Sequence, residues 1–298
     1  MPVIDNAQPL VRDLFTEEAV SARGGRPAAG MFLCSGDATT AEICAGAGMD
    51  YLLIDAEHAP LTLQDVLTQL RTIAGYRVPT MVRVPALDTV VIKQFLDLGA
   101  QTLLVPLVST PEQAAHAVDD LRYPRPLGED GTPQDEGDGD FGGILRGDRG
   151  VGSALARSGR WNRIGGYLRD GDRHVSLFVQ VETADGVANA HAIASTPGVD
   201  GVFVGPSDLS ASMGLLGQQS HPDVVAAVKQ TIEAVKAAGK IVGVNTFVQA
   251  QAEDYAAAGA DFVNVGADVA ILARGAEALA DAWCPAAEGE AGGERASY

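Results

Sequence analysis

The sequence predicts a single α/β domain folded as a (β/α)8 TIM barrel. Short apolar runs rich in β-branched residues alternate along the chain with alanine- and leucine-rich stretches of helical period, which is typical of parallel βα units. Eight such units can be counted. The chain has 298 residues, which is enough for one barrel and an addition but short for two domains. Hydrophobic residues make up 46% of it, so a core of that size can be filled.

Each predicted strand is followed by a predicted helix. The strands are expected at residues 29–35, 51–55, 80–84, 102–106, 175–182, 201–204, 241–245 and 262–265. The clearest helices are expected at residues 62–73, 90–98, 111–121, 186–194, 222–238, 250–258 and 269–282. Several helix-to-strand junctions repeat a glycine and a small residue before a polar one, as in Gly99-Ala100-Gln101 and Gly259-Ala260-Asp261. Such a glycine ends a helix in the left-handed conformation, so this theme is structural.

One region breaks the alternation. Between residues 123 and 172 Pro, Gly and Asp dominate, and no period survives over residues 125–148. Its acidic stretch lacks the spacing and the closing Glu of an EF-hand, which favours disorder or a solvated lobe over a calcium site. We therefore expect one barrel domain over residues 1–285 with a loop insertion at about 124–148, and a mobile tail over residues 286–298.

The composition excludes several classes of protein. A net charge of −18 argues against a nucleic-acid partner, because binding a phosphate backbone requires a basic surface. No apolar run of about 18 residues predicts a membrane span, and the N-terminus has no apolar segment of signal-peptide type. The three cysteines show no metal-site or disulfide spacing, so we expect reduced thiols. A cytoplasmic protein is predicted.

Polar residues that end the apolar runs are the candidate site, because the active sites of such barrels lie at the carboxyl ends of the strands. We expect these residues to converge: Asp55, Glu57 and His58 after the second strand, Arg83 on the third, Gln180 and Glu182 on the fifth, Ser207 and Asp208 after the sixth, and Asn245 on the seventh.

Glu182 and Asp208 end neighbouring strands and offer the hard oxygen ligands that Mg²⁺ or Mn²⁺ prefers, with most coordination positions left open. Either carboxylate taken alone could equally be a helix cap or a surface ion pair. His58 beside two carboxylates fits a general acid or base, and Arg83 fits a fixed cation for an oxyanion. A packed histidine and a structural Arg–Asp pair are equally open alternatives for these two residues.

Five ordered motifs taken together resemble the HpcH/HpaI family of class II 2-oxo-acid aldolases. The resemblance covers roughly residues 30–279 apart from the insertion. Its motifs are residues 53–60 (LIDAEHAP), 93–99 (KQFLDLG), 101–106 (QTLLVP), 149–157 (RGVGSALAR) and 201–210 (GVFVGPSDLS). The type member cleaves 4-hydroxy-2-oxoheptane-1,7-dioate. The resemblance implies a barrel of the phosphoenolpyruvate/pyruvate type.

It also implies reversible cleavage of a 4-hydroxy-2-oxo acid to pyruvate and an aldehyde through a metal-bound enolate. Glu182 and Asp208 would hold Mg²⁺, Mn²⁺ or Co²⁺, and Arg83 would face the oxygen that becomes the enolate. His58 would pair with Asp97 to manage the proton of the aldol hydroxyl. Gln180, Ser207, Asp55 and Glu57 are the further substrate-binding candidates. A homohexamer with exchanged C-terminal helices is implied as well.

One departure from the family pattern, the positions of the lysines and two alternative functions bear on this hypothesis. The insertion is longer than the family's usual connection and precedes the Arg149–Gly152 stretch, which we expect near the mouth of the barrel, so the aldehyde is left open. None of the four lysines lies mid-strand in the candidate site, which disfavours a Schiff-base mechanism. The alternatives are a lyase for citryl- or malyl-CoA-like thioesters and a catalytically idle barrel that binds oxo acids.

Overall fold

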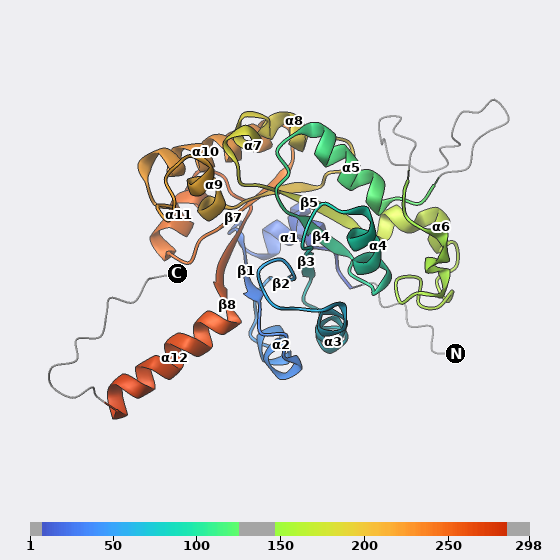
Figure 1. Ribbon diagram of the computed structural model, residues 1–298, viewed down its shortest axis with the longest axis horizontal. Helices are drawn as coiled ribbons and strands as arrows, with labels where there is room; N and C mark the ends of the chain where they lie inside the picture. The colour runs from blue at the N-terminus through green and yellow to red at the C-terminus, as the bar shows by residue number, and fades with distance from the viewer. Residues whose placement is uncertain (1–7, 125–146, 285–298) are drawn as a thin grey trace.

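The computed structural model describes residues 8–124 and 147–284. Eight strands form a closed barrel in chain order, and each pairs in parallel with the next (Figure 1). β8 closes the barrel against β1 with Ala28 opposite Phe262. The strands are β1 (Ala28–Leu33), β2 (Tyr51–Asp55), β3 (Thr80–Arg83), β4 (Thr102–Val105), β5 (Ser176–Val181), β6 (Gly201–Val204), β7 (Ile241–Asn245) and β8 (Phe262–Ala267). The predicted (β/α)8 barrel is confirmed, and three of the eight predicted strands have the predicted bounds.

The helices follow the strands as expected. They are α2 (Ala38–Ala45), α3 (Leu63–Ile73), α4 (Thr89–Asp97), α5 (Pro111–Leu121), α7 (Ala184–Ala188), α8 (Ala190–Ala194), α9 (Pro206–Ser212), α10 (Pro222–Ala237), α11 (Gln249–Ala257) and α12 (Asp268–Trp283). Thr62 and Thr110 begin α3 and α5 with capping boxes, in which each cap hydroxyl accepts a backbone N–H three residues later. The helix predicted over residues 186–194 was wrong, because the chain breaks at Asn189 into two short helices.

The repeated glycine theme has the structural role expected of it. Gly48, Gly99 and Gly259 have φ angles of +89°, +99° and +107°, in the left-handed region that a Cβ disfavours. Each follows the end of a helix and precedes a strand. These glycines therefore lie at the amino end of the barrel, away from the candidate site.

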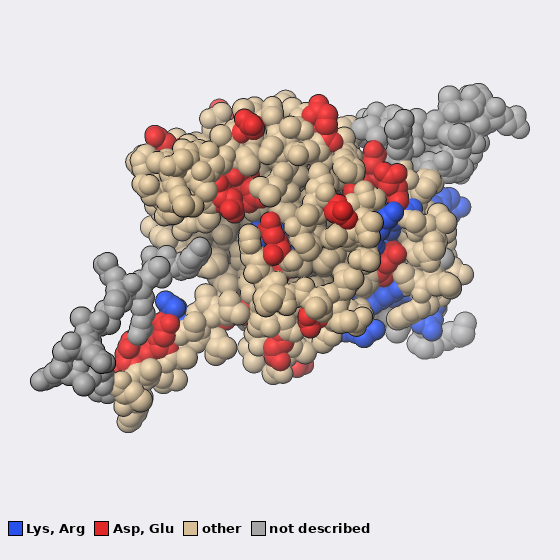
Figure 2. All heavy atoms as spheres, viewed as in Figure 1, with Lys and Arg blue, Asp and Glu red and all other residues tan. Residues whose placement is uncertain are grey.

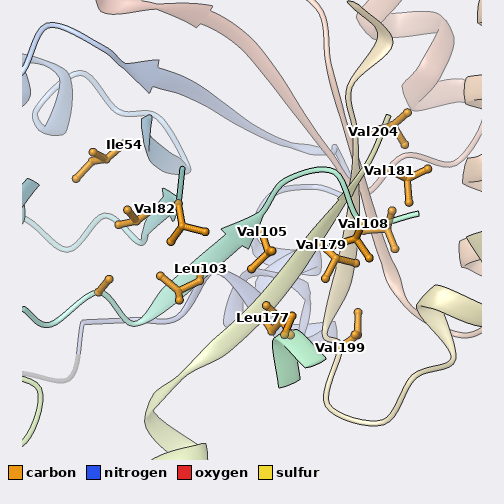
Figure 3. Close-up of a cluster of buried hydrophobic side chains, with 14 of the residues drawn as sticks. Ile54, Val82, Leu103, Val105, Val108, Leu177, Val179, Val181, Val199 and Val204 are labelled. Atoms are coloured by element: carbon orange, nitrogen blue, oxygen red, sulfur yellow. The ribbon is translucent and has the colours of Figure 1, made fainter. Parts of the chain in front are cut away.

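Two apolar layers hold the barrel together. Inside it, aromatic side chains from β2, β5, β6 and β8 meet, with the ring centroids of Tyr51, Phe178 and Phe203 all within 5.7 Å of the Phe262 ring centroid. Outside it, the other face of each strand packs aliphatic side chains against the helices, as Figure 3 shows for Val82, Leu103 and their neighbours. Because strand side chains alternate, the residue two positions beyond an inward-facing aromatic residue also points inward, as Gln180 does after Phe178, nearer the carboxyl end of the barrel.

Before the barrel, η1 (Val11–Phe15) and α1 (Glu17–Ala22) precede β1, and Val11 is fully buried beneath the barrel. Val11 packs with the aromatic layer, and its N–H donates to the Thr102 hydroxyl at the start of β4. The amino end of the barrel is thus closed by the chain itself, which leaves the carboxyl end for chemistry.

The last helix projects away from the barrel (Figure 1). Asp268 at its first position is buried and accepts the backbone N–H groups of Cys34 and Ser35, which fixes the start of α12 to the end of β1. The rest of α12 exposes large apolar side chains, including Ile271 (61%), Leu272 (70%) and Trp283 (82%).

The predicted insertion at about 124–148 and the predicted tail at 286–298 lie almost wholly outside the described residues. After residue 146 the chain forms η2 (Val151–Leu155), α6 (Tyr167–Asp170) and η3 (Gly171–His174). Arg149 donates its N–H to the Arg122 carbonyl, just after α5 ends. The expectation that Arg149–Gly152 lies near the mouth was therefore wrong, because α5 runs back from the mouth and ends at the amino side.

Figure 2 shows acidic residues spread over the visible face, with Lys and Arg gathered beside α4 and α6. Among the described residues, no helix is long and apolar enough to cross a membrane.

Candidate active site

Arg83 is the centre of the candidate site. It ends β3, it is 6% exposed, and its Nε and Nη2 donate to the two carboxylate oxygens of Asp55 at 2.9 and 2.7 Å. β2 and β3 pair in register with Asp55 opposite Arg83, which sets the two side chains next to each other. Burial lowers the pKa of Arg83, but the hydrogen bond and charge of Asp55 outweigh it and raise the pKa above its usual value. The guanidinium is therefore a permanently charged group in one orientation.

Three further contacts surround this guanidinium. Glu57 Oε2 lies 3.0 Å from Nη1, and the Phe32 ring centroid on β1 lies 5.1 Å from Cζ. Gln180 Oε1 lies 3.5 Å from Nη1, at the limit of hydrogen bonding. Bidentate pairing and ring stacking both restrict rotation, so Arg83 presents its remaining N–H to a fixed point.

His58 lies at the edge of the site. Its Nε2 is 3.6 Å from Glu57 Oε2, and its side chain is 62% exposed. Asp55 Oδ1 also accepts the backbone N–H of Glu57 at 3.1 Å, which holds the turn after β2. One carboxylate thus fixes both Arg83 and the loop that carries His58.

The fifth strand brings Gln180 and Glu182 inward side by side. Gln180 Nε2 donates to Glu182 Oε2, and Glu182 Oε1 accepts the N–H of Leu107 at 2.8 Å. Gly205 at the end of β6 lies so close that a Cβ there would be 2.7 Å from Glu182 Oε2. The Glu182 carboxylate is therefore held on three sides.

Asp208 and Ser207 follow β6 in the first turn of α9, and Asp208 is exposed. Ser207 donates its hydroxyl to Gln219 at 2.5 Å, and its carbonyl accepts the Ser210 hydroxyl. These bonds fix the turn that places Asp208 beside the neighbouring strand end.

Burial raises the pKa of Glu182 to about 7, against the lowering effect of the Leu107 N–H, and the charges of Asp208 and Glu57 raise it further. Burial also raises the pKa of Glu57, which Arg83 and His58 oppose. Like charges this close favour protonation unless a cation is present. Two hard carboxylates whose charges repel are what a divalent metal requires.

Glu182 and Asp208 therefore fit a metal that keeps open positions for water and substrate. Among residues 8–124 and 147–284, no group of three or more His, Cys, Asp or Glu side chains is arranged to hold a metal ion.

Asp97 is not brought to His58 within one chain. α4 starts after β3 at the mouth and runs back, so Asp97, its last residue, lies toward the amino end of the barrel. There Asp97 Oδ1 is 3.6 Å from Arg149 Nη2. Asn245 lies on β7 with its inward neighbours, but its Oδ1 has no hydrogen-bond partner in the described chain.

Three site residues were missed by the sequence analysis. Gly205 precedes Pro206, and a small residue at a strand end could have signalled the close approach of another side chain. Phe32 lies one inward-facing position beyond the aromatic layer on β1. Alternation along the strand could therefore have indicated that its side chain faces the site. Leu107 has a φ of +55°, which sequence gives no reason to expect at a leucine.

The sequence model described as HpcH/HpaI aldolase/citrate lyase matches residues 28–274, which span the whole barrel. The chain belongs to the HpcH/HpaI aldolase/citrate lyase family. The resemblance that the sequence motifs indicated is thereby confirmed.

Relatives within this family cover nearly all of the chain. A hydroxypyruvate/pyruvate aldolase of Deinococcus radiodurans is 48% identical over 257 residues, 86% of each chain. A 4-hydroxy-2-oxo-heptane-1,7-dioate aldolase of Salmonella dublin is 46% identical over 258 residues, 87% of this chain and 90% of its own. The crystal structure of a family protein from Burkholderia cenocepacia has a TM-score of 0.75 and 41% identity, and covers 86% of this chain and 95% of that one.

This HpcH/HpaI family member is a carbon–carbon lyase of the aldolase type that acts on small molecules. The alternative of a catalytically idle barrel is therefore wrong.

Proposed function

We propose that this enzyme cleaves a 4-hydroxy-2-oxo acid reversibly to pyruvate and an aldehyde, in a reaction that depends on a divalent metal. The observation that carries the proposal is the fixed, buried Arg83 guanidinium beside a set of mutually repelling carboxylates that includes Glu182 and Asp208. A charged donor next to a cation site is the setting in which negative charge on a 2-oxo oxygen is stabilised. The names of the 46–48% identical relatives support this class of substrate.

Glu182 and Asp208 are the proposed metal ligands, for Mg²⁺, Mn²⁺ or Co²⁺. When bound, the metal supplies Lewis-acid chemistry that lowers the energy of the pyruvate enolate. Glu182 must lose its proton to serve as a ligand, and Gln180 and the Leu107 N–H hold its two oxygens in place while it does so.

Arg83 is the proposed hydrogen-bond donor to the 2-oxo oxygen as negative charge develops there. Asp55, proposed at first as a substrate contact, uses both oxygens on Arg83, so its role is to orient that donor. Glu57 holds the same guanidinium from another side. Gln180 and Ser207 are the remaining candidates to orient the substrate carboxylate through polar contacts.

His58 is the proposed acid–base group for the aldol hydroxyl, in a pair with Asp97. Because the two residues lie at opposite ends of one barrel, the pair requires Asp97 from a second copy of the chain. The exposed apolar face of α12 supports an assembly in which this helix packs on another copy. We propose a homohexamer with exchanged C-terminal helices, and the cytoplasmic location stays a prediction.

The lysines support a metal-dependent mechanism. All four bind elsewhere: Lys93 donates to the Asp148 carbonyl, Lys240 to the Val199 carbonyl, and Lys229 and Lys236 pair with surface carboxylates. A Schiff base needs a lysine amine in the site. The family description names citrate lyase as well as aldolase, but the relatives of 46–48% identity are named as aldolases, which favours aldol cleavage over the CoA-thioester alternative.

The deciding experiment is a pyruvate-release assay on a panel of 4-hydroxy-2-oxo acids. Cleavage should stop in excess EDTA and return with Mn²⁺, Mg²⁺ or Co²⁺. Borohydride with pyruvate should trap no covalent adduct. Full activity in EDTA, or inactivation by borohydride and pyruvate, would overturn the metal-dependent mechanism.

A further inference from the structure

Arg149 is the largest side chain that the described part of the chain buries completely, with 1% of it exposed. Its guanidinium lies between two tyrosine rings, with Cζ 4.4 Å from the Tyr123 centroid and 5.6 Å from the Tyr167 centroid. Nη2 donates to the Tyr167 hydroxyl at 3.3 Å, and the Tyr123 hydroxyl shares a hydrogen bond with Ser153. The guanidinium is thus held in one orientation away from water.

This burial is not explained by packing. Within the described residues, Nε and Nη1 of Arg149 have no hydrogen-bond acceptor. A buried charge with unpaired donors costs stability that an apolar side chain of similar volume would not cost. Cation–π contact with two rings offsets part of this cost. The positive charge of Arg149 therefore acts on a group outside the pocket that Tyr123 and Tyr167 form.

The group it acts on is Asp97, whose Oδ1 lies 3.6 Å from Nη2 and whose side chain is 39% exposed. Asp97 ends α4, where the helix dipole disfavours a negative charge. Burial raises the pKa of Asp97 above its usual value, and the charges of Arg149 and Lys93 offset part of this rise. Oδ1 makes no hydrogen bond within the described chain. Arg149 thus helps to keep the Asp97 carboxylate ionised while its outer side stays open.

We propose that Arg149 is a positioning residue that holds Asp97 charged and oriented toward His58 of a second copy of the chain. The inference rests on the proposed His58–Asp97 pair. It adds that Arg149 charges and orients the Asp97 carboxylate within one chain, before a second copy binds. Tyr123 and Tyr167 fix the guanidinium, and the guanidinium fixes Asp97. Arg149 itself touches neither substrate nor metal.

The test is a double-mutant cycle on aldol cleavage with saturating Mn²⁺. Asp97→Asn should lower kcat by at least about 100-fold, as expected for loss of an acid–base partner. Arg149→Met should lower kcat by at least about tenfold, and Arg149→Lys should recover part of that loss. In the Asp97→Asn background Arg149→Met should change kcat by less than about twofold, because its only route to the reaction is gone.

Arg163→Met is the matched control. Arg163 also lies over an aromatic ring, 5.5 Å from the Trp161 centroid, in the same segment, but it is exposed. The Arg163→Met variant should leave kcat and the pH profile of kcat/KM unchanged, whereas Arg149→Met should shift the pH profile of kcat/KM. The charged groups that face the pair are Glu57 beside His58 and Lys93 beside Asp97.

Three results separate the hypotheses. Wild-type kcat in Arg149→Met, or an equal loss in the Asp97→Asn background, shows that Arg149 is only structural. Wild-type kcat in Asp97→Asn overturns the pair and this inference together, but leaves the aldolase proposal intact. Absence of pyruvate release with every metal overturns the proposed function itself. If Arg149→Met does not fold, Arg149→Lys and Tyr167→Phe enter the same cycle with the same criteria.

Discussion

Replacing Glu182 by Gln should remove a loss of stability that the metal-free enzyme shows as the pH rises. In the folded chain burial and the neighbouring carboxylates raise the pKa of Glu182 from 4.5 to about 7. The unfolded chain releases this proton near pH 4.5, and the folded chain keeps it to about pH 7. The stability that this group contributes is therefore fully present below about pH 4.5 and is lost as the pH rises to about 7.

The size of the effect follows from the shift. One pKa unit corresponds to about 1.4 kcal/mol, so the free energy of unfolding should fall by about 3 kcal/mol across this window. For a chain of this length that is roughly 6–10 °C in Tm. Gln resembles the protonated acid, since it still accepts the Leu107 N–H but carries no charge. The variant should lack this pH-dependent loss and be the more stable protein at pH 8 without metal.

The assay is thermal unfolding in EDTA from pH 5 to 8 at constant protein concentration, repeated in excess Mn²⁺. Manganese should stabilise the wild type more as the pH rises, because the metal displaces the proton, and should stabilise the variant much less. Glu233→Gln, the same change on the exposed face of α10, should behave as wild type. An identical pH slope in Glu182→Gln and wild type, or equal stabilisation by Mn²⁺, would refute this reasoning.

Three other variants test the site and the assembly. Arg83→Lys keeps the charge but loses the planar fork, so kcat should fall by about 100-fold while Tm falls only a few degrees; unchanged turnover would remove Arg83 from the mechanism. Gly205→Ala adds a Cβ 2.7 Å from Glu182 Oε2, and calorimetry should show Mn²⁺ binding weakened by roughly tenfold. Gly150→Ala, where the Cβ meets open space, is its control, and equal Kd values would contradict the close approach. Leu272→Asp, on the exposed face of α12, should dissociate the oligomer in sedimentation; an intact assembly would argue against helix packing there.

The sequence by itself determined the barrel and most of the strand ends. Short apolar runs rich in β-branched residues are local properties, so they predicted β2, β6 and β7 with the bounds that the structure has. Polar residues at strand ends predicted that Asp55, Arg83, Gln180 and Glu182 would converge, because parallel strands of a closed barrel deliver their carboxyl ends to one mouth. The family motifs then indicated a lyase.

Only the tertiary structure decided which of these side chains hold one another. Asp55 was a substrate candidate until both of its oxygens were found on Arg83, a bond that depends on the register of β2 against β3. Arg149 was expected at the mouth, yet it lies at the other end beside Asp97, because the direction of α5 and α4 fixes where their ends meet. Distances between segments far apart in sequence are set by packing, and no local pattern carries them.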